Sequence, residues 1–243
     1  MVSMSVKRVV KRTFRYFGYD LTRLDPRSHV LARRGKFLRM YNISLVLDVG
    51  ANTGQYGKEI RELGYTGRIV SFEPMSAAYK LLQARAESDE SWETLNIGLG
   101  EKEEQALINI SKNSYSSSLL ENLPANLVSE PDTVYIGQER IEIRTLDTVI
   151  KRLRDQSDRV YLKIDAQGYE DRVLKGASEA LRDIDTVQLE MTIKPLYSGG
   201  LLFDEMHRRL NELGYRLVSI EPGFADRNTC ELLQYDGIYH RDS

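Results

Sequence analysis

The sequence predicts an α/β fold in which a doubly wound, mainly parallel sheet is covered by helices on both faces. From residue 44 onward, short apolar runs typical of buried strands alternate with helix-like segments. The first run ends in a glycine-rich turn that leads into a helix. The last two strand-like segments have no helix between them, so we expect the C-terminal strand to run antiparallel to its neighbour.

The first half of the domain is expected to contain three strands and two helices. The first helix, over 54–63, ends where Gly64 takes the C′ position. The second helix, over 76–86, is expected to be capped by the hydroxyl of Ser76. The strands that accompany them are predicted over 44–49, 68–72 and 92–97.

An irregular insertion is expected at about residues 99–158. It contains two strand-like pieces, a polar serine-rich loop and a short helix, predicted over 106–110, 134–143, 114–118 and 146–153. Regular alternation then resumes. Strands are expected over 160–164, 186–191, 215–220 and 230–239, and helices over 170–174 and 202–213.

Composition limits the class of protein. The 243 residues are 41% hydrophobic and 29% charged, as in an ordinary soluble domain. No apolar run reaches the roughly 18 residues of a membrane-spanning helix, and no secretory signal is recognisable. The single cysteine, Cys230, excludes an internal disulfide and a cysteine-rich metal site. We expect it to be a reduced, mostly buried thiol in the cytoplasm.

Charge divides the chain into a basic N-terminal helical arm, residues 1–40, and a domain, residues 41–243. The arm holds eleven Lys and Arg against two Asp, a net of +9, whereas the rest carries −11. Aromatic residues (Phe14, Tyr16, Phe17, Tyr19) are interleaved with the bases. Three readings stay open: a solvated helix, contact with an anionic membrane surface, or contact with the phosphates of a nucleotide or lipid carrier. Nucleic acid is disfavoured, because no known binding module accompanies the charge.

The turn after the first strand reads Asp48-Val49-Gly50-Ala51-Asn52-Thr53-Gly54. Gly50 permits a tight turn, and Gly54 lets the next helix approach the sheet. A dinucleotide site would need glycine where Asn52 stands, and the P-loop pattern G-x-x-x-x-G-K-[ST] is not matched either. Asp48 at the strand end would repel a diphosphate and favour an amino or sulfonium cation. The sequence therefore disfavours a nicotinamide oxidoreductase.

A second carboxylate follows the second strand. Glu73 lies 23 residues after Gly50, where an acid binds the ribose hydroxyls of a nucleoside. A cation near Asp48, a carboxylate at the helix start and a ribose on Glu73 together describe S-adenosylmethionine. The alternative is a structural turn and a surface glutamate.

The chain resembles the FkbM-type methyltransferases. The resemblance rests on seven blocks in order: LDVGANTGQYG (47–57), SFEP (71–74), NIGLG (96–100), SSSLL (116–120), IRTLDTVI (143–150), YLKIDAQGYEDRVLKGA (161–177) and VQLEM (187–191). It implies a class I Rossmann-like methyltransferase that transfers a methyl group to a hydroxyl oxygen. Many members carry an acid where this chain has Gln167, so we expect no metal site at Asp165 and position 167.

Catalytic candidates follow the later strands. Methyl transfer needs a positioned acceptor and a base near its hydroxyl. Lys163 and Asp165 alternate on one side of their strand, and Asp165 lies nearer the edge where the acceptor must sit. Glu190 follows the next strand as a further candidate. The alternative is an Asp–Lys pair that only ties a strand end to a helix.

The predicted cofactor-binding residues come from four segments: Asp48, Gly50, Ala51, Asn52, Gly54, Gln55, Tyr56; Glu73, Pro74, Asn96; Ser117, Ser118; and Asp165. The function expected is O-methylation of a sugar, glycan or glycoconjugate, free or linked to a nucleotide or lipid. A small polyketide-like acceptor and a non-catalytic cofactor-binding protein are the alternatives. The expected location is the cytoplasm or the inner membrane surface, and a homo-oligomer is left open.

Overall fold

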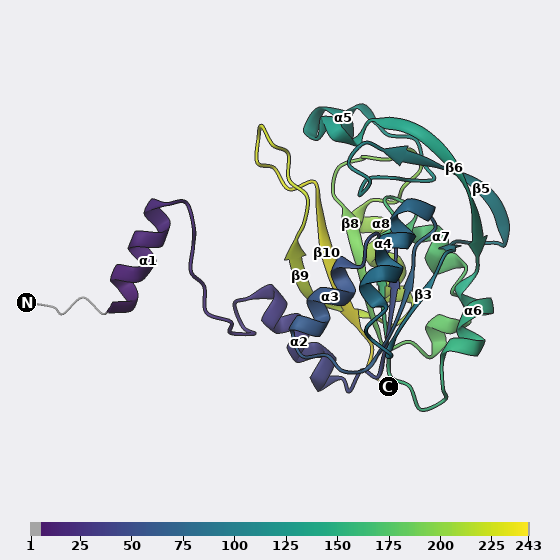
Figure 1. The fold of residues 1–243 in the computed structure, drawn as a ribbon, viewed down its shortest axis with the longest axis horizontal. Helices are drawn as coiled ribbons and strands as arrows, with labels where there is room; N and C mark the ends of the chain where they lie inside the picture. The colour runs from purple at the N-terminus through teal and green to yellow at the C-terminus, as the bar shows by residue number, and fades with distance from the viewer. Residues whose placement is uncertain (1–5, 243) are drawn as a thin grey trace, which may run out of the picture.

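The structure is a computed structural model that describes residues 6–242. Its core is a seven-stranded sheet in the order β3-β2-β1-β7-β8-β10-β9 (Figure 1). All neighbouring strands pair in parallel except β10, which is antiparallel to both β8 and β9. The predicted doubly wound sheet with one reversed strand is confirmed. The strands are β1 Leu45–Val49, β2 Arg68–Phe72, β3 Trp92–Leu95, β7 Val160–Ile164, β8 Thr186–Thr192, β9 Arg216–Pro222 and β10 Gln234–His240.

Two helical layers cover the sheet because its strands are apolar on both faces. Leu47 packs into a cluster with α6, α7 and α8, whereas its neighbour Val46 packs into a cluster with α2, α3 and α4. The covering helices are α2 Val30–Met40, α3 Gln55–Glu62, α4 Ser76–Ala86, α6 Leu146–Leu153, α7 Glu170–Lys175 and α8 Phe203–Glu212. Each helix and strand expected from the sequence is present, with ends displaced by a few residues.

Strand register brings three carboxyl ends to one level. Val49 of β1 pairs with Phe72 of β2 on one side and with Ile164 of β7 on the other. The turns that follow these strands therefore lie next to one another at one edge of the sheet, where open parallel sheets bind ligands.

The insertion forms a small sheet of its own over this edge. Its strands are β4 Gly98–Leu99, β5 Glu104–Ser111 and β6 Tyr135–Arg144, in the order β4-β6-β5, and β5 and β6 curve past the end of the main sheet (Figure 1). A short helix, α5 Pro124–Ser129, lies in the connection between them. Ile108, Ile141 and Ile143 pack against Met75 and Ala78. The expected insertion, at about residues 99–158, includes the following helix, α6. In the structure the apolar side chains of α6 lie in the main core.

Two local expectations are wrong. Met75, not Ser76, is the N-cap of α4, and it makes no capping bond. The backbone N and Oγ of Ser76 both donate to Glu139 of β6, so a neighbouring strand supplies the carboxylate that binds the helix start. Cys230 is exposed rather than buried, with a φ of 60°. It belongs to a tight turn around Asp226, so β10 begins only at Gln234.

The basic arm contains two helices with different surroundings. α1, Val6–Tyr16, stands away from the domain on an extended connection (Figure 1). α2 packs on the domain and buries Arg34, Gly35 and Leu38. No helix within residues 6–242 is long and apolar enough to cross a bilayer. The boundary at residue 40 stays a prediction.

Candidate cofactor and acceptor site

The glycine turn after β1 is shaped by positive backbone angles. Gly50 has a φ of 72° and Gly54 a φ of 83°, and Asn52 between them has a φ of 47°. A Cβ on Gly50 would lie 1.8 Å from the carbonyl oxygen of Asp165, so only glycine fits where this turn meets the end of β7. The tight turn predicted at Gly50 is confirmed, and it brings the ends of β1 and β7 into direct contact.

Glu73 is held at the end of β2 by backbone donors. Glu73 is 3% exposed, and its carboxylate accepts hydrogen bonds from the N–H of Asn52 at 2.8 Å and of Met75 at 2.9 Å. Burial raises the pKa of Glu73 to about 7 despite these bonds. The side chain of Asn96 donates to the carbonyls of Glu73 and Pro74. Asn96 therefore holds the turn and does not line the cavity.

A cavity opens between Glu73 and the insertion. One wall is Phe72, Glu73, Pro74 and Met75, and another is formed by Leu99, Ile108, Ile141 and Ile143 of the small sheet. Ser117 and Ser118 of the serine-rich loop and Asp165 complete it. Apolar walls with a few polar groups are typical of a small-molecule site. The loop is fixed here because Ser118 Oγ donates to the carbonyl oxygen of Gln167 at 2.7 Å.

A second cavity adjoins the first on the α2 and α3 side of the sheet. The two cavities share Gly50, Asn52, Tyr115 and Asp165. Tyr115, which is 60% exposed, therefore stands at their junction. Apart from Ala51, the other residues that line the second cavity have polar or charged side chains. They are Arg34, Gln55, Tyr56, Glu59, Lys163, Gln188 and Asp236.

A row of polar side chains crosses the sheet beneath the two cavities. Register aligns Ser71, Asp48, Lys163 and Gln188 on adjacent strands. Ser71 Oγ donates to Asp48 at 3.1 Å, and it accepts a hydrogen bond from the indole of Trp92. Directly paired residues of a sheet point to the same face, so this row lies under α2 and α3.

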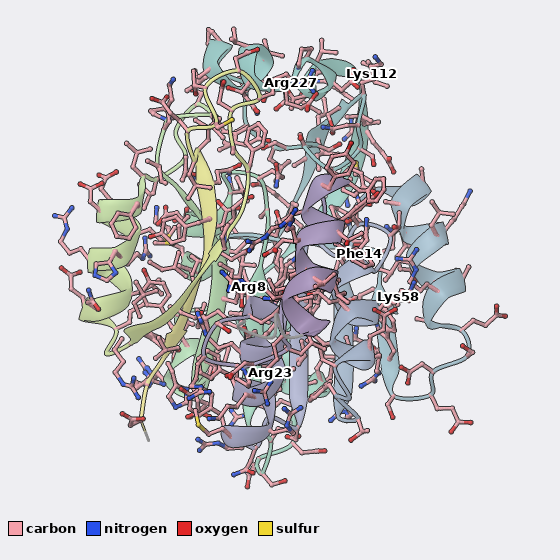
Figure 2. All side chains as sticks on the ribbon, turned by 90° about the vertical axis from the view of Figure 1, so that its left-hand side faces the viewer. Arg8, Phe14, Arg23, Lys58, Lys112 and Arg227 are labelled. Carbon is pink, nitrogen blue, oxygen red and sulfur yellow. The ribbon has the colours of Figure 1, made fainter. Side chains whose placement is uncertain are left out.

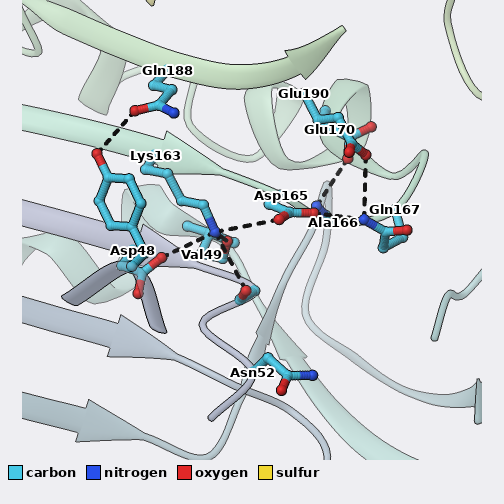
Figure 3. A network of polar contacts seen from close by, with 12 residues as sticks. Asp48, Val49, Asn52, Lys163, Asp165, Ala166, Gln167, Glu170, Gln188 and Glu190 are labelled. Carbon is cyan, nitrogen blue, oxygen red and sulfur yellow. Dashed lines mark hydrogen bonds and ion pairs between the residues drawn. The ribbon is translucent and has the colours of Figure 1, made fainter. Parts of the chain in front are cut away.

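Lys163 connects Asp48 of this row with Asp165, which follows the end of β7 (Figure 3). Its Nζ lies 3.2 Å from Asp48 Oδ1 and 3.7 Å from Asp165 Oδ2. Burial alone would lower the pKa of Lys163, but the two carboxylates outweigh burial, so its pKa is raised. Asp48 is completely buried, whereas the side chain of Asp165 is 38% exposed. Asp48 therefore forms a buried ion pair with Lys163, whereas Asp165 is the one of these two acids that a ligand can contact.

Gln167 fixes the other side of Asp165 (Figure 3). Its Nε2 donates to Asp165 Oδ1 at 2.7 Å and to Glu190 Oε2 at 3.3 Å, and its Oε1 accepts from Tyr197 Oη at 2.7 Å. Burial and then the nearby Asp165 raise the pKa of Glu190 well above its usual value. Glu190 lines neither cavity, so it is placed to position Gln167 rather than to contact an acceptor.

Sequence reasoning missed Glu170, which shapes the turn after β7. Its buried carboxylate accepts from the N–H of Ala166 at 2.9 Å and of Gly168 at 3.2 Å, and burial raises its pKa to about 7. Gln167 between these donors has a φ of 52°. The turn that follows Asp165 is therefore stabilised by hydrogen bonds from its own backbone to the Glu170 carboxylate.

The structure divides the predicted site residues into three groups. Seven line the first cavity: Gly50, Asn52, Glu73, Pro74, Ser117, Ser118 and Asp165. Ala51, Gln55, Tyr56 and Lys163 line the second. Asp48, Gly54, Asn96 and Glu190 line neither. Tyr115, Arg34, Gln188 and Asp236 are lining residues that the sequence analysis missed. In the part of the chain that is described, no group of three or more His, Cys, Asp or Glu is arranged to hold a metal ion.

Arg34 connects the basic arm to this site. Its guanidinium is buried between the carboxylates of Glu59 on α3 and Glu221 on β9, and it lies 5.0 Å from the centre of the Tyr56 ring. Since Arg34 also lines the second cavity, α2 forms part of the wall.

Comparison with known proteins identifies the family. A family model described as the methyltransferase FkbM domain matches residues 48–217, more than half of the chain. The chain belongs to the FkbM methyltransferase family. It is thus a methyltransferase that uses S-adenosylmethionine. Membership decides against the nicotinamide oxidoreductase and against a purely non-catalytic role.

The solved structures that are similar to this chain have low sequence identity to it. A putative methyltransferase from Thermobifida fusca is 13% identical, with a TM-score of 0.50 over 88% of this chain and 79% of that chain. An rRNA methylase from Streptococcus thermophilus is 8% identical, with a TM-score of 0.47 over 89% and 98%. Magnesium protoporphyrin IX methyltransferase from Synechocystis, solved with bound SAM, is 10% identical, with a TM-score of 0.46 over 100% of each chain. A search of curated proteins finds no significant match.

Proposed function

We propose that this FkbM methyltransferase methylates a hydroxyl oxygen of a sugar, a glycan or a glycoconjugate. The observation that carries the proposal is the second cavity, which meets the first at Asp165 and is lined by carboxylates, amides and tyrosines as well as by Arg34 and Lys163. Ionised carboxylates accept hydrogen bonds from hydroxyl groups, and amides both donate and accept them. A ligand with many hydroxyls would find further donors and acceptors along such a wall, whereas a mainly apolar polyketide would displace water from these polar groups without replacing its hydrogen bonds.

The residues of the first cavity fit the cofactor. We propose that the nucleoside lies against Met75 and Ile143 with its ribose hydroxyls on Glu73. Gly98 supports this fit, because a Cβ there would press on Ile143 at 2.7 Å and on Pro74 at 3.4 Å. When bound, S-adenosylmethionine supplies a methyl group on a positively charged sulfur. The methionine end would then reach the shared residues Gly50 and Asn52, next to Asp165.

Asp165 is proposed to orient the acceptor hydroxyl and to take its proton. Gln167 occupies one of its carboxylate oxygens, and the other lies on the side of Lys163. The Lys163 ammonium lies 3.7 Å from that oxygen and holds the carboxylate in place, and a positioned carboxylate can act as a general base. Tyr115 at the junction would exclude water from the reacting groups. Lys163 and Glu190 are positioning residues in this proposal.

The experiment uses tritium-labelled methyl groups on S-adenosylmethionine. The full chain is incubated with separate pools of free oligosaccharides, nucleotide sugars, lipid-linked saccharides, polyketides and RNA. We expect label in a saccharide pool, as an ether that mild base does not remove, whereas a methyl ester would be released. Asp165→Asn should abolish transfer while leaving the affinity for S-adenosylhomocysteine, measured by calorimetry, within about threefold. Label in polyketide or RNA alone would overturn the acceptor class.

The proposed cellular location depends on which saccharide is the acceptor. A lone cysteine fits the reducing cytoplasm, which we propose as the compartment. An arm that contacts a membrane surface would favour the lipid-linked acceptor among the saccharides. A homo-oligomer is not required, since both cavities are formed within one chain.

A further inference from the structure

The helix α1 presents side chains to solvent on every side. Its residues from Arg8 onward are exposed, including apolar ones: Val9 is 47%, Val10 41% and Phe14 43% exposed. Aromatic side chains continue past its end at Phe17 and Tyr19, each 68% exposed. α1 has 11 residues, and isolated helices shorter than roughly 12–15 residues are only marginally stable in water. A partner that covers α1 would therefore stabilise it.

The exposed side chains of α1 separate into two faces. At 100° per residue, the apolar residues and one threonine fall on one side of the helix, and the bases fall on the other. Between Arg8 and Arg15, the apolar face is Val9, Val10, Thr13 and Phe14, and the basic face is Arg8, Lys11, Arg12 and Arg15. Figure 2, in which this helix faces the viewer, labels Arg8 and Phe14 on its two flanks.

The charge on α1 is of one sign. No acid lies within Val6–Tyr16, and the nearest, Asp20, pairs with Arg15 at 2.8 Å. Basic residues opposite an aromatic and aliphatic face are typical of helices that lie in a membrane interface. A nucleic acid would neutralise the basic face but would leave the aliphatic residues Val9 and Val10 in water. The lipid surface is therefore the better complement.

We propose that residues 6–19 form an in-plane anchor for an anionic lipid bilayer. Val9, Val10 and Phe14 enter the boundary between headgroups and acyl chains, and the bases contact lipid phosphates. The domain, with its net charge of −11, is repelled by the same surface, so contact is confined to the arm. This binding does not depend on the acceptor proposed above.

The test is sedimentation of the full chain with vesicles. One set is phosphatidylcholine alone, and the other contains phosphatidylglycerol as well. We expect binding to the anionic vesicles only, weakening as salt is raised. Arg8→Gln, Lys11→Gln and Arg12→Gln combined should lower the partition constant about a hundredfold, because each base near the surface contributes ~1 kcal/mol.

Matched variants separate this proposal from general electrostatics. Lys80→Gln, Arg85→Gln and Lys151→Gln remove three exposed bases from the domain and should leave vesicle binding within about twofold. The emission of the Phe14→Trp variant should shift to the blue only with anionic vesicles. Thermal melting verifies that each variant remains folded.

Three results would overturn the proposal. They are equal binding to neutral vesicles, equal losses from the arm and domain triple variants, and tighter binding to an RNA or DNA duplex than to anionic vesicles at the same ionic strength. Failure of methyl transfer would not bear on any of them.

Discussion

The ionised carboxylate of Glu73 is expected to stabilise the bound nucleoside and, above neutral pH, to lower the free energy of unfolding of the protein. Its pKa is raised from 4.5 to about 7 by burial, so between these values the folded chain holds a proton that the unfolded chain has released. Stability therefore falls as pH rises from 4.5 and the loss is complete above pH 7. At ~1.4 kcal/mol per pKa unit, the carboxylate costs about 3 kcal/mol.

The Glu73→Gln variant isolates this cost. It loses one good hydrogen bond to a backbone N–H at every pH, which shifts its stability by a constant. Its free energy of unfolding relative to wild type should still rise by about 2.5 kcal/mol between pH 5 and pH 8. The assay is urea unfolding at each pH. A constant difference between the two proteins over this range would refute the reasoning.

The pH dependence of ligand affinity tests the same ionisation of Glu73 by a second measurement. Hydrogen bonds to a charged group are stronger than those to a neutral one by about 1 kcal/mol each. Two ribose hydroxyls on Glu73 would together contribute about 2 kcal/mol, so wild-type affinity for S-adenosylhomocysteine should rise about thirtyfold through pH 7, and Glu73→Gln should remove the rise. Glu170→Gln is the control, because Glu170 also has a pKa of about 7 but lines neither cavity. It should change the pH dependence of stability and leave that of affinity unchanged.

Three further changes have definite expectations. Lys163→Met leaves Asp48 buried without its cation and should lower the free energy of unfolding, measured in urea, by about 3–5 kcal/mol; an unchanged midpoint would contradict the ion pair. Gly50→Ala should cost about 3 kcal/mol or more and abolish S-adenosylhomocysteine binding, whereas Gly137→Ala, with open space around it, should stay within about 1 kcal/mol of wild type. Gln167→Glu adds a carboxylate between the two that this side chain bridges, so the pH at half-maximal methyl transfer should rise; an unchanged pH profile would remove Gln167 from the site.

The sheet and the glycine turn could be predicted because their signals are local. Buried strands read as apolar runs, and Gly50 and Gly54 stand where the backbone needs positive φ. The role of Asp48 could not be read in the same way. Its position at a strand end is local, but its partner Lys163 lies on a strand that is adjacent only in space. The sequence therefore located the carboxylate and missed that it is buried and paired.

The second cavity was beyond sequence reasoning for a related reason. Arg34, Gln188 and Asp236 come from α2, β8 and β10, and no spacing in the chain connects them. Asp236 follows from the reversed strand, whose register sets it opposite Glu190. Only folding shows that such separate positions line one space. Tyr115 left a weak signal, as an aromatic residue within a run of serines.

The charge balance around Lys163 has a consequence for turnover. Two carboxylates, Asp48 and Asp165, share one ammonium, so the trio has a formal net charge of −1 beside the cavities. A sulfonium compound brings a compensating charge, and the thioether left after donation does not. The product left after methyl donation should therefore be bound less tightly than S-adenosylmethionine, which favours its replacement by a fresh cofactor.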